Sequence, residues 1–407
     1  MQLTPRTALL QFAHVLQQDL FPVLEAAVGP LSKHLQLLAS VVCLLPLCRL
    51  LTARKASTGR PAKDRAALAT AFIAKSILNL PTTRDLIGRL EVDEPLRAFC
   101  GWPNRRALPH ESKFSRAFAE FAATELPQQL HEAVIAATQS GRLIGHIARD
   151  STAILARERF LETVRQKEDR EAQQREYKRT RKAKRKGKPV ATTPGVKRQK
   201  GRHKRAKAAD RGTRIQRQRH QKVERMLQEL PRQCDMGAKK NSQGREQYWR
   251  GYKLHLDVAD GQVPISAVLT SASVHDSQVA IPLMTMTSKR VVHLYELMDS
   301  AYDANDIHAH CRSLDHVPII APHARRGARK PALFSRATPA PATPQLTWAQ
   351  QDRYKERTMS ERVNARLKDE FGANHIRVRG AAKVMAHLMF GVLALTVDQW
   401  LRLRPAG

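Results

Sequence analysis

The chain has 407 residues, a length that predicts two or three domains with ordinary cores and excludes a peptide or a single small module. Lysine and arginine total 70 against 37 aspartate and glutamate residues, and the formal charge of +33 indicates a polyanionic partner, nucleic acid first. Hydrophobic residues make up 42%, so the charge is added to a folding chain and wholesale disorder is not expected.

Cysteine usage and hydropathy indicate a cytoplasmic protein without a membrane span. The five cysteines include no C-x-x-C pair, so neither a disulfide framework nor a zinc ribbon is predicted. The most apolar run, residues 37–51, contains Pro46 and Arg49 and is too short to cross a bilayer as one helix. We interpret it as a buried core helix.

Residues 1–140 are predicted to form a helical N-terminal domain, because their amphipathic segments are separated by prolines. Within it, residues 60–102 have the pattern of two or three short helices joined by proline-containing turns. This pattern is compatible with a module that binds DNA ends, and equally with simple helical packing.

A second domain is predicted over residues 141–403, beginning with the apolar run LIGHIA and a strand that ends at Asp150. Two insertions interrupt it, a basic one at 157–246 and one rich in Pro, Ala and Arg at 321–348. Between Arg157 and Arg225 there are 27 Lys or Arg residues and 8 acids, a surplus of about +19. We expect this basic insert to be largely disordered and to neutralise phosphates, although a merely solvated segment is the alternative.

The segment after the basic insert alternates strands and helices. Residues 248–273 predict a β-hairpin about the Asp-Gly turn at Asp260, and Asp276 is interpreted as the N-cap of a following helix. Next come a strand ending near Asp299, a short helix and a buried strand. Long helical patterns over 348–371 and 382–403 close the chain.

Two carboxylates, Asp150 and Asp299, fall at the ends of predicted strands, where catalytic groups of α/β sheets are commonly placed. Either residue alone is more often a turn or helix cap. In the predicted helix 348–371, an acid, two cations and a phenol lie within an arc of about 60° on one face: Tyr354, Arg357, Glu361 and Lys368. Such a set can hold a metal ion beside a DNA phosphate.

At these residues the sequence resembles the insertion-sequence DDE transposases, whose signature is Tyr-x2-Arg-x3-Glu-x6-Lys. The match at Tyr354, Arg357, Glu361 and Lys368 is complete. The strings ARDSTAI and LMDSAYDA resemble the strands that carry the family's first and second aspartates, and RPAKDRAALATAFI and ESKFSRAF are similar to its helical domain.

The resemblance implies an α/β fold in which an RNase H-like mixed sheet is flanked by helices. It also implies that Asp150, Asp299 and Glu361 form an acidic triad that binds Mg²⁺ or Mn²⁺, with two ions expected, because hard cations prefer carboxylate oxygens. Tyr354, Arg357 and Lys368 would contact the DNA backbone. The expected partners are double-stranded DNA, as terminal inverted repeats and target, and a second copy of the chain in the active complex.

Several alternatives remain at this point. Asp276 and Asp303 are rivals for the triad, but we interpret Asp276 as an N-cap and Asp303 as a helix cap too, and His275 as structural. A non-catalytic DNA-binding protein, such as a degenerate transposase acting as a repressor or architectural factor, is the main functional alternative. An RNA-binding protein built around the basic segment would explain the charge but not the ordered acids.

Overall fold

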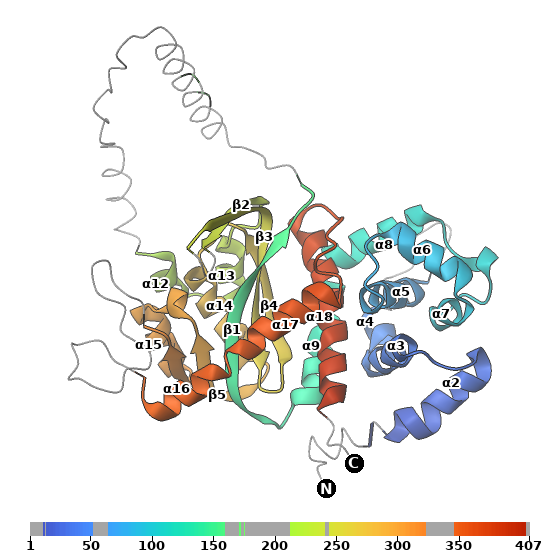
Figure 1. Cartoon of the computed structure of the whole chain (residues 1–407), viewed down its shortest axis with the longest axis horizontal. Coiled ribbons are helices and arrows are strands. Elements are labelled where there is room, and N and C mark those ends of the chain that lie inside the picture. Colours follow the sequence, from blue (N-terminus) through green and yellow to red (C-terminus); the bar gives the residue numbers. More distant parts are fainter. Residues whose placement is uncertain are drawn as a thin grey trace.

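The computed structural model describes residues 11–12, 14–51, 64–158, 171, 175, 212–240, 244–322 and 346–403. The N-terminal part is helical, as predicted (Figure 1). Its elements are the π-helical turn η1 (Val15–Leu20), α2 (Phe21–Val28), α3 (Lys33–Leu44), α4 (Leu47–Leu51), α5 (Arg65–Ile77), α6 (Thr83–Val92), α7 (Glu94–Phe99), the 3-10 turn η2 (Arg105–Ala107), α8 (Glu111–Ala123) and α9 (Leu126–Gln139).

Local capping explains where several of these helices begin. Asp64 accepts hydrogen bonds from the first amides of α5, and Thr82 forms a reciprocal capping box with Asp85 at the start of α6. The apolar run 37–51 was predicted as one buried helix, and this is wrong. It forms parts of two helices, because Pro46 separates α3 from α4.

The second part of the chain is built on one six-stranded mixed sheet with the order β2-β3-β1-β5-β6, in which β4 also pairs with β3. β1 is antiparallel to β3 and parallel to β5, and β5 is parallel to β6. This is the predicted RNase H-like arrangement. The strands are β1 (Leu143–Leu155), β2 (Asp235–Lys240), β3 (Glu246–Ala259), β4 (Val263–Ser271), β5 (Val292–Met298) and β6 (Val317–Ile320).

The predicted hairpin is confirmed as β3 and β4, with Asp260 and Gly261 in the turn. The end predicted for the first strand is wrong, because β1 continues beyond Asp150 to Leu155 and Ser151–Leu155 pair with β3. Gly251 of β3 lies where this strand pairs with the end of β1, and a Cβ there would collide with the backbone carbonyl of Ile154.

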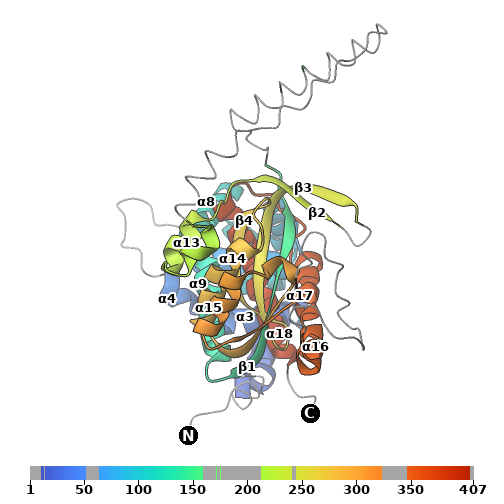
Figure 2. The same ribbon diagram turned by 90° about the vertical axis from the view of Figure 1, so that its left-hand side faces the viewer.

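Residues 212–240, which the sequence analysis assigned to the basic insert, form α12 (Arg214–Gln218), α13 (Val223–Glu229) and β2. β2 pairs with the first half of β3, and these two strands extend beyond the body of the sheet (Figure 2). The rest of the predicted insert, apart from residues 157–158, 171, 175 and 244–246, lies outside the described residues. So do residues 323–345 of the predicted 321–348 insertion.

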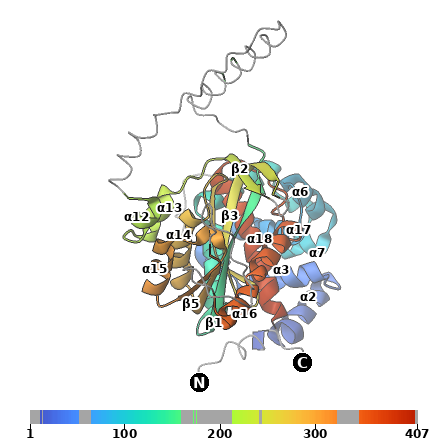
Figure 3. The same ribbon diagram turned by 60° about the vertical axis from the view of Figure 1, so that its left-hand side comes forward.

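Helices cover both faces of the sheet. α14 (Ser277–Ser288) and α15 (Asn305–Ser313) lie on one side, and α16 (Trp348–Lys355) and α17 (Thr358–Asp369) lie on the other (Figures 2 and 3). A short 3-10 turn, η4 (Ser300–Tyr302), follows β5. α14 contacts β3 and β4, whereas α17 contacts β1 and β3.

The closing helix α18 (Ala381–Arg402) joins the sheet to the N-terminal helices (Figure 1). It packs against β4 on one side and against α3, α5, α8 and α9 on the other. Among the described residues, α18 is the one helix long and apolar enough to span a membrane, but 72% of its apolar window is buried inside the protein. We therefore assign it to the core.

Candidate active site

Two of the predicted acids, Asp150 and Asp299, lie side by side because the pairing of two parallel strands brings them level. β1 and β5 pair with Ala148 opposite Leu297, so two residues farther along each strand Asp150 lies level with Asp299. Strands paired in this way are about 4.8 Å apart. Asp299 directly follows β5, and its Oδ1 accepts the amide of Ala301 at 2.9 Å, which fixes the side chain at the start of η4.

The positive charges and amides around the two aspartates do not fully offset the cost of burying their negative charge. Burial raises the pKa of Asp150 to about 6, although the Ser151 amide and the charges of Lys239 and Arg357 oppose the rise. Burial also raises the pKa of Asp299 despite the Ala301 amide. Without a further cation, one proton is therefore retained more readily here than on a carboxylate in water.

The third predicted acid, Glu361, lies on α17 and is paired with Arg357. Its Oε1 is 2.6 Å from Nη2 of Arg357, and its side chain is 52% exposed. One turn farther along α17, Asn364 donates a hydrogen bond from Nδ2 to Oδ2 of Asp150 at 3.1 Å. α17 is thus placed against Asp150, and the charge of Arg357 acts on Asp150 and Asp299 as well as on Glu361.

The three acids are not assembled into an ion-sized cluster. Within the described part of the chain, one set of three potential ligands has its ligand atoms within 4.8 Å of one another, and that set is His293, Glu296 and His316. Binding of a metal by all three predicted acids therefore requires Glu361 to leave Arg357 and turn toward Asp150. The chemistry of the donor set fits Mg²⁺ or Mn²⁺, since it offers carboxylates whose charge needs a cation.

The helix predicted over 348–371 is two helices, so the predicted single stripe is wrong in its geometry. Between α16 and α17, Arg357 donates its amide to Tyr354 and accepts that of Ser360, and these shorter i→i−3 bonds break the α-helical pattern. The side chains still converge. The Arg357 guanidinium lies 5.8 Å from the centre of the Tyr354 ring, and burial raises the pKa of Tyr354.

Lys368, at the end of α17, belongs to the same side of the site. Burial and the neighbouring Lys239 lower its pKa, whereas the charge of Asp150 opposes this effect. Lys239 is a residue of this site that could not be recognised in the sequence. It lies on β2, its charge acts on both aspartates, and nothing in a run of basic residues distinguishes it until β2 pairs with β3.

The rival acids have other partners, but not the ones predicted. Asp276 occupies the N-cap position of α14 without capping it, and instead its Oδ1 lies 2.9 Å from Nζ of Lys253. Asp303 hydrogen-bonds with His308 at 3.1 Å, and the N-cap of α15 is Ala304. Asp276 therefore does not make the predicted capping bond, and Asp303 is not the N-cap residue of α15. His275 contacts Ser277 at 2.8 Å, a local structural interaction.

A second charged cluster, which the sequence did not reveal, lies on the opposite side of β1. Nη2 of Arg149 is 2.7 Å from Oδ2 of Asp257 and 3.1 Å from Oε2 of Glu296, and all three side chains are fully buried. Thr287 of α14 donates to Asp257 at 2.6 Å, and His293 bonds with Glu296 at 2.9 Å. Burial acts to raise the pKa of Glu296, but Arg149 and the histidines outweigh it and hold that pKa low.

Comparison with known families assigns both parts of the chain. Residues 212–397, which include Asp299 and Glu361 but begin after Asp150, match the transposase DDE domain. Residues 23–120 match a second transposase domain, DUF772. No curated protein and no solved structure matches the chain. With an RNase H-like sheet preceded by a helical transposase domain, the chain belongs to the DDE transposases of insertion sequences.

Proposed function

We propose that this transposase binds the terminal inverted repeats of its element, cleaves phosphodiester bonds there and joins the ends to target DNA in a reaction that depends on Mg²⁺ or Mn²⁺. The observation that carries the proposal is the pair Asp150, within β1, and Asp299, directly after β5, which lie level on adjacent parallel strands and have pKa values raised by burial. We place the reaction in the cytoplasm, with a homodimer pairing two ends.

In this proposal Asp150, Asp299 and Glu361 hold the ions, of which we expect two. The ions supply activation of the attacking water or 3′-hydroxyl and stabilisation of the leaving oxygen. Asn364 keeps Asp150 oriented through its hydrogen bond. Arg357, released from Glu361, becomes available to a phosphate, which a guanidinium can bind through two parallel hydrogen bonds.

Tyr354 and Lys368 complete the contacts to the DNA backbone near the cleaved bond. The Arg357 guanidinium lies 5.8 Å from the Tyr354 ring centre and the charge of Asp150 acts on Lys368, which supports this assignment, and Lys239 adds a cation from β2. These contacts carry no base information, so they position the end and leave sequence recognition to other parts of the chain.

The test is cleavage of a linear duplex that carries the border of the element, with Mg²⁺, Mn²⁺ or EDTA. We expect Asp150→Asn, Asp299→Asn and Glu361→Gln each to lower the cleavage rate by about 10³-fold or more, since ion-assisted charge stabilisation is worth several kcal/mol. Glu370→Gln is the matched control, because Glu370 also pairs with an arginine four residues earlier and is 47% exposed.

Retention of full cleavage by the three variants would show that the site assignment is wrong. Selective binding of the end DNA with a steep salt dependence, but no metal-dependent nicking, would instead favour the non-catalytic DNA-binding alternative.

A further inference from the structure

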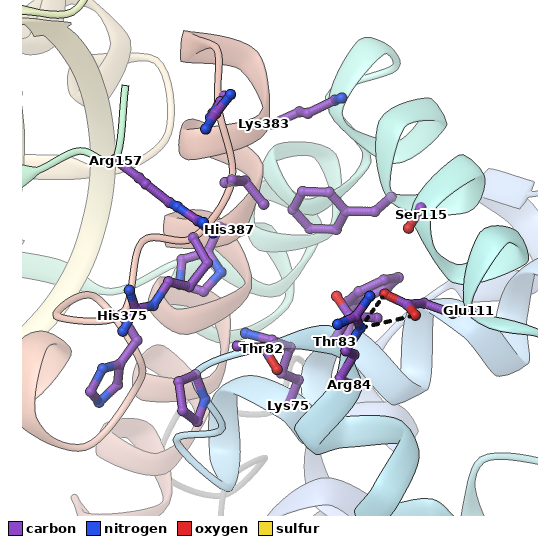
Figure 4. Close-up of a pocket in the computed structure, with 16 residues that line it drawn as sticks. Lys75, Thr82, Thr83, Arg84, Glu111, Ser115, Arg157, His375, Lys383 and His387 are labelled. Carbon is purple, nitrogen blue, oxygen red and sulfur yellow. Dashed lines mark hydrogen bonds and ion pairs between the residues drawn. The ribbon is translucent and has the colours of Figure 1, made fainter. Parts of the chain in front are cut away.

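A cavity of about 590 Å³ lies at the junction between the N-terminal helices and the segment that links α17 to α18 (Figure 4). One wall comes from α5, α6 and α8, and the other comes from residues 375–379 and the start of α18. Its volume is in the range of sites that hold ligands. None of the proposed catalytic residues lines it.

The lining is strongly cationic. Of the 16 residues around the cavity, six are lysine or arginine: Lys75, Arg84, Arg157, Arg377, Arg379 and Lys383. Glu111 is the one acid among these lining residues, and Nε of Arg84 already binds both of its oxygens at 3.1 Å. Cations brought together from both parts of the chain repel one another, so the cavity is electrostatically suited to an anion.

Lys75 gives a second, independent indication of an anionic ligand. Its side chain lines the cavity and the residue is only 7% exposed, yet within the described part of the chain no hydrogen bond or ion pair is formed by its ammonium group. Burial lowers the pKa of Lys75 to about 8, and the nearest counter-charge, Asp85, is engaged by the amide and hydroxyl of Thr82. The side chain is therefore mostly buried, and its ammonium group faces the cavity, where a bound anion would stabilise the charge.

We propose that this junction cavity binds the phosphodiester backbone of the DNA end at a distance from the cleaved bond. The proposal rests on the proposed function and adds to it the place where the helical domain and the catalytic domain hold the same DNA strand. Duplex DNA fits better than a small free anion because three of the lining cations, Arg377, Arg379 and Lys383, are exposed to solvent and accessible to a large polyanion.

The strand β1 connects the two sites and sets their spacing. From Asp150 it runs five residues to Leu155, about 17 Å at 3.3 Å per residue, and Arg157 of the cavity follows. Glu158 then accepts the amide of Gly380 at 2.7 Å and the hydroxyl of Tyr252 at 2.9 Å, which ties this end of β1 to the cavity wall. Arg157 itself lies up to about 23 Å from Asp150, so at about 3.4 Å per base pair the contacted phosphates lie about five to seven base pairs from the scissile one.

The experiment is a scan in which single phosphates of the end duplex are replaced by neutral methylphosphonates, with binding measured on the full-length protein. We expect affinity to fall at phosphates about five to seven base pairs from the cleavage position. In the double variant Arg379→Gln/Lys383→Gln, the same methylphosphonate replacements should lower the DNA affinity no further. The slope of log affinity against log salt concentration should become shallower by about 1–2.

The matched control is Lys289→Gln/Arg312→Gln, which removes the same charge from exposed positions at the other end of the sheet. It should keep the wild-type methylphosphonate pattern. Lys75→Met provides a second probe, since it should weaken DNA binding while leaving the melting temperature of the free protein unchanged or higher.

Three results would overturn the inference: an unchanged pattern in the cavity variant, the same change in the control, or full DNA affinity in Lys75→Met. They differ from failure of the proposed function, which would appear as a wild-type protein that neither selects nor cleaves the end duplex.

Discussion

The two faces of β1 carry two acidic clusters with opposite character. On one face, Arg149 forms ion pairs with Asp257 and Glu296, and all three side chains are fully buried. On the other face, the charges of Arg357 and Lys239 only partly stabilise the ionised forms of Asp150 and Asp299. Burial therefore raises the pKa of both acids. Consecutive residues of one strand thus serve different purposes.

The difference shows how a structural acid can be told from a functional one. The Arg149 cluster contains its own cation, and its ion pairs hold β1, β3 and β5 together. The Asp150 site is left with unbalanced charge, which lowers the stability of the free protein and favours a bound cation. Substitutions on the two faces should therefore change stability in opposite directions.

The largest effect is expected from Arg149→Met. This substitution leaves two carboxylates buried without their cation, and we expect the free energy of unfolding to fall by about 3–5 kcal/mol, measured by urea denaturation. Arg149→Met/Asp257→Asn/Glu296→Gln removes the buried charge as a set and should recover most of the loss. Equal destabilisation of both variants would mean that packing, and not charge, holds this cluster.

Asp150→Asn should act in the other direction. It removes an uncompensated buried charge, so at pH 7.5 in EDTA we expect the free energy of unfolding to rise by about 1–3 kcal/mol. The same variant should be inactive in DNA cleavage. A lower melting temperature for this variant would place Asp150 among the structural acids.

The pH dependence of the stability difference between Asp150→Asn and wild type tests whether the charge of Asp150 causes it. The pKa of Asp150 is raised to about 6 in the folded protein, so the folded state binds more protons than the unfolded state between pH 3.8 and about 6. The loss of folding stability caused by the buried charge of Asp150 is complete above pH 6, and it disappears as the pH falls toward 3.8. We therefore expect the advantage of Asp150→Asn over wild type to shrink through this window, and a difference that stays constant would exclude a charge effect.

Glu361→Gln should change stability least. Its ion pair with Arg357 is half exposed, and such pairs contribute about 0–1 kcal/mol. We expect unfolding in EDTA to match wild type within that margin, although cleavage is lost. A loss of several kcal/mol would show that the Arg357 pair is structural, and would contradict the movement of Glu361 that the proposed site requires.

The sequence predicts the local part of this site well. β5 ends at Met298 and leaves Asp299 at its end, and the Asp-Gly turn joins β3 to β4, because turn residues and apolar runs mark these positions. The continuation of β1 past Asp150 could not be predicted, since Ser151 and Thr152 are polar and become strand only by pairing with β3.

What the sequence misses depends on contacts between distant segments. Arg149 looks like a surface residue beside a strand end until Asp257 and Glu296 are brought to it from two other strands. Lys239 lies among many basic residues, and only the pairing of β2 with β3 places it near the aspartates. The break between α16 and α17, at Glu356–Arg357, contains neither proline nor glycine. The helical pattern of the sequence therefore continues across it and predicts a single helix.

The most direct test of the account counts bound Mn²⁺ by electron paramagnetic resonance in metal-stripped protein at pH 7.5. The account predicts up to two bound ions in the wild type, and affinity at least about tenfold weaker in Asp150→Asn and Asp299→Asn, because each variant removes a ligand. His293→Gln, which alters the one ion-sized ligand cluster in the described residues, should bind Mn²⁺ as wild type does. Unchanged binding in both aspartate variants, with loss in His293→Gln, would contradict the central claim.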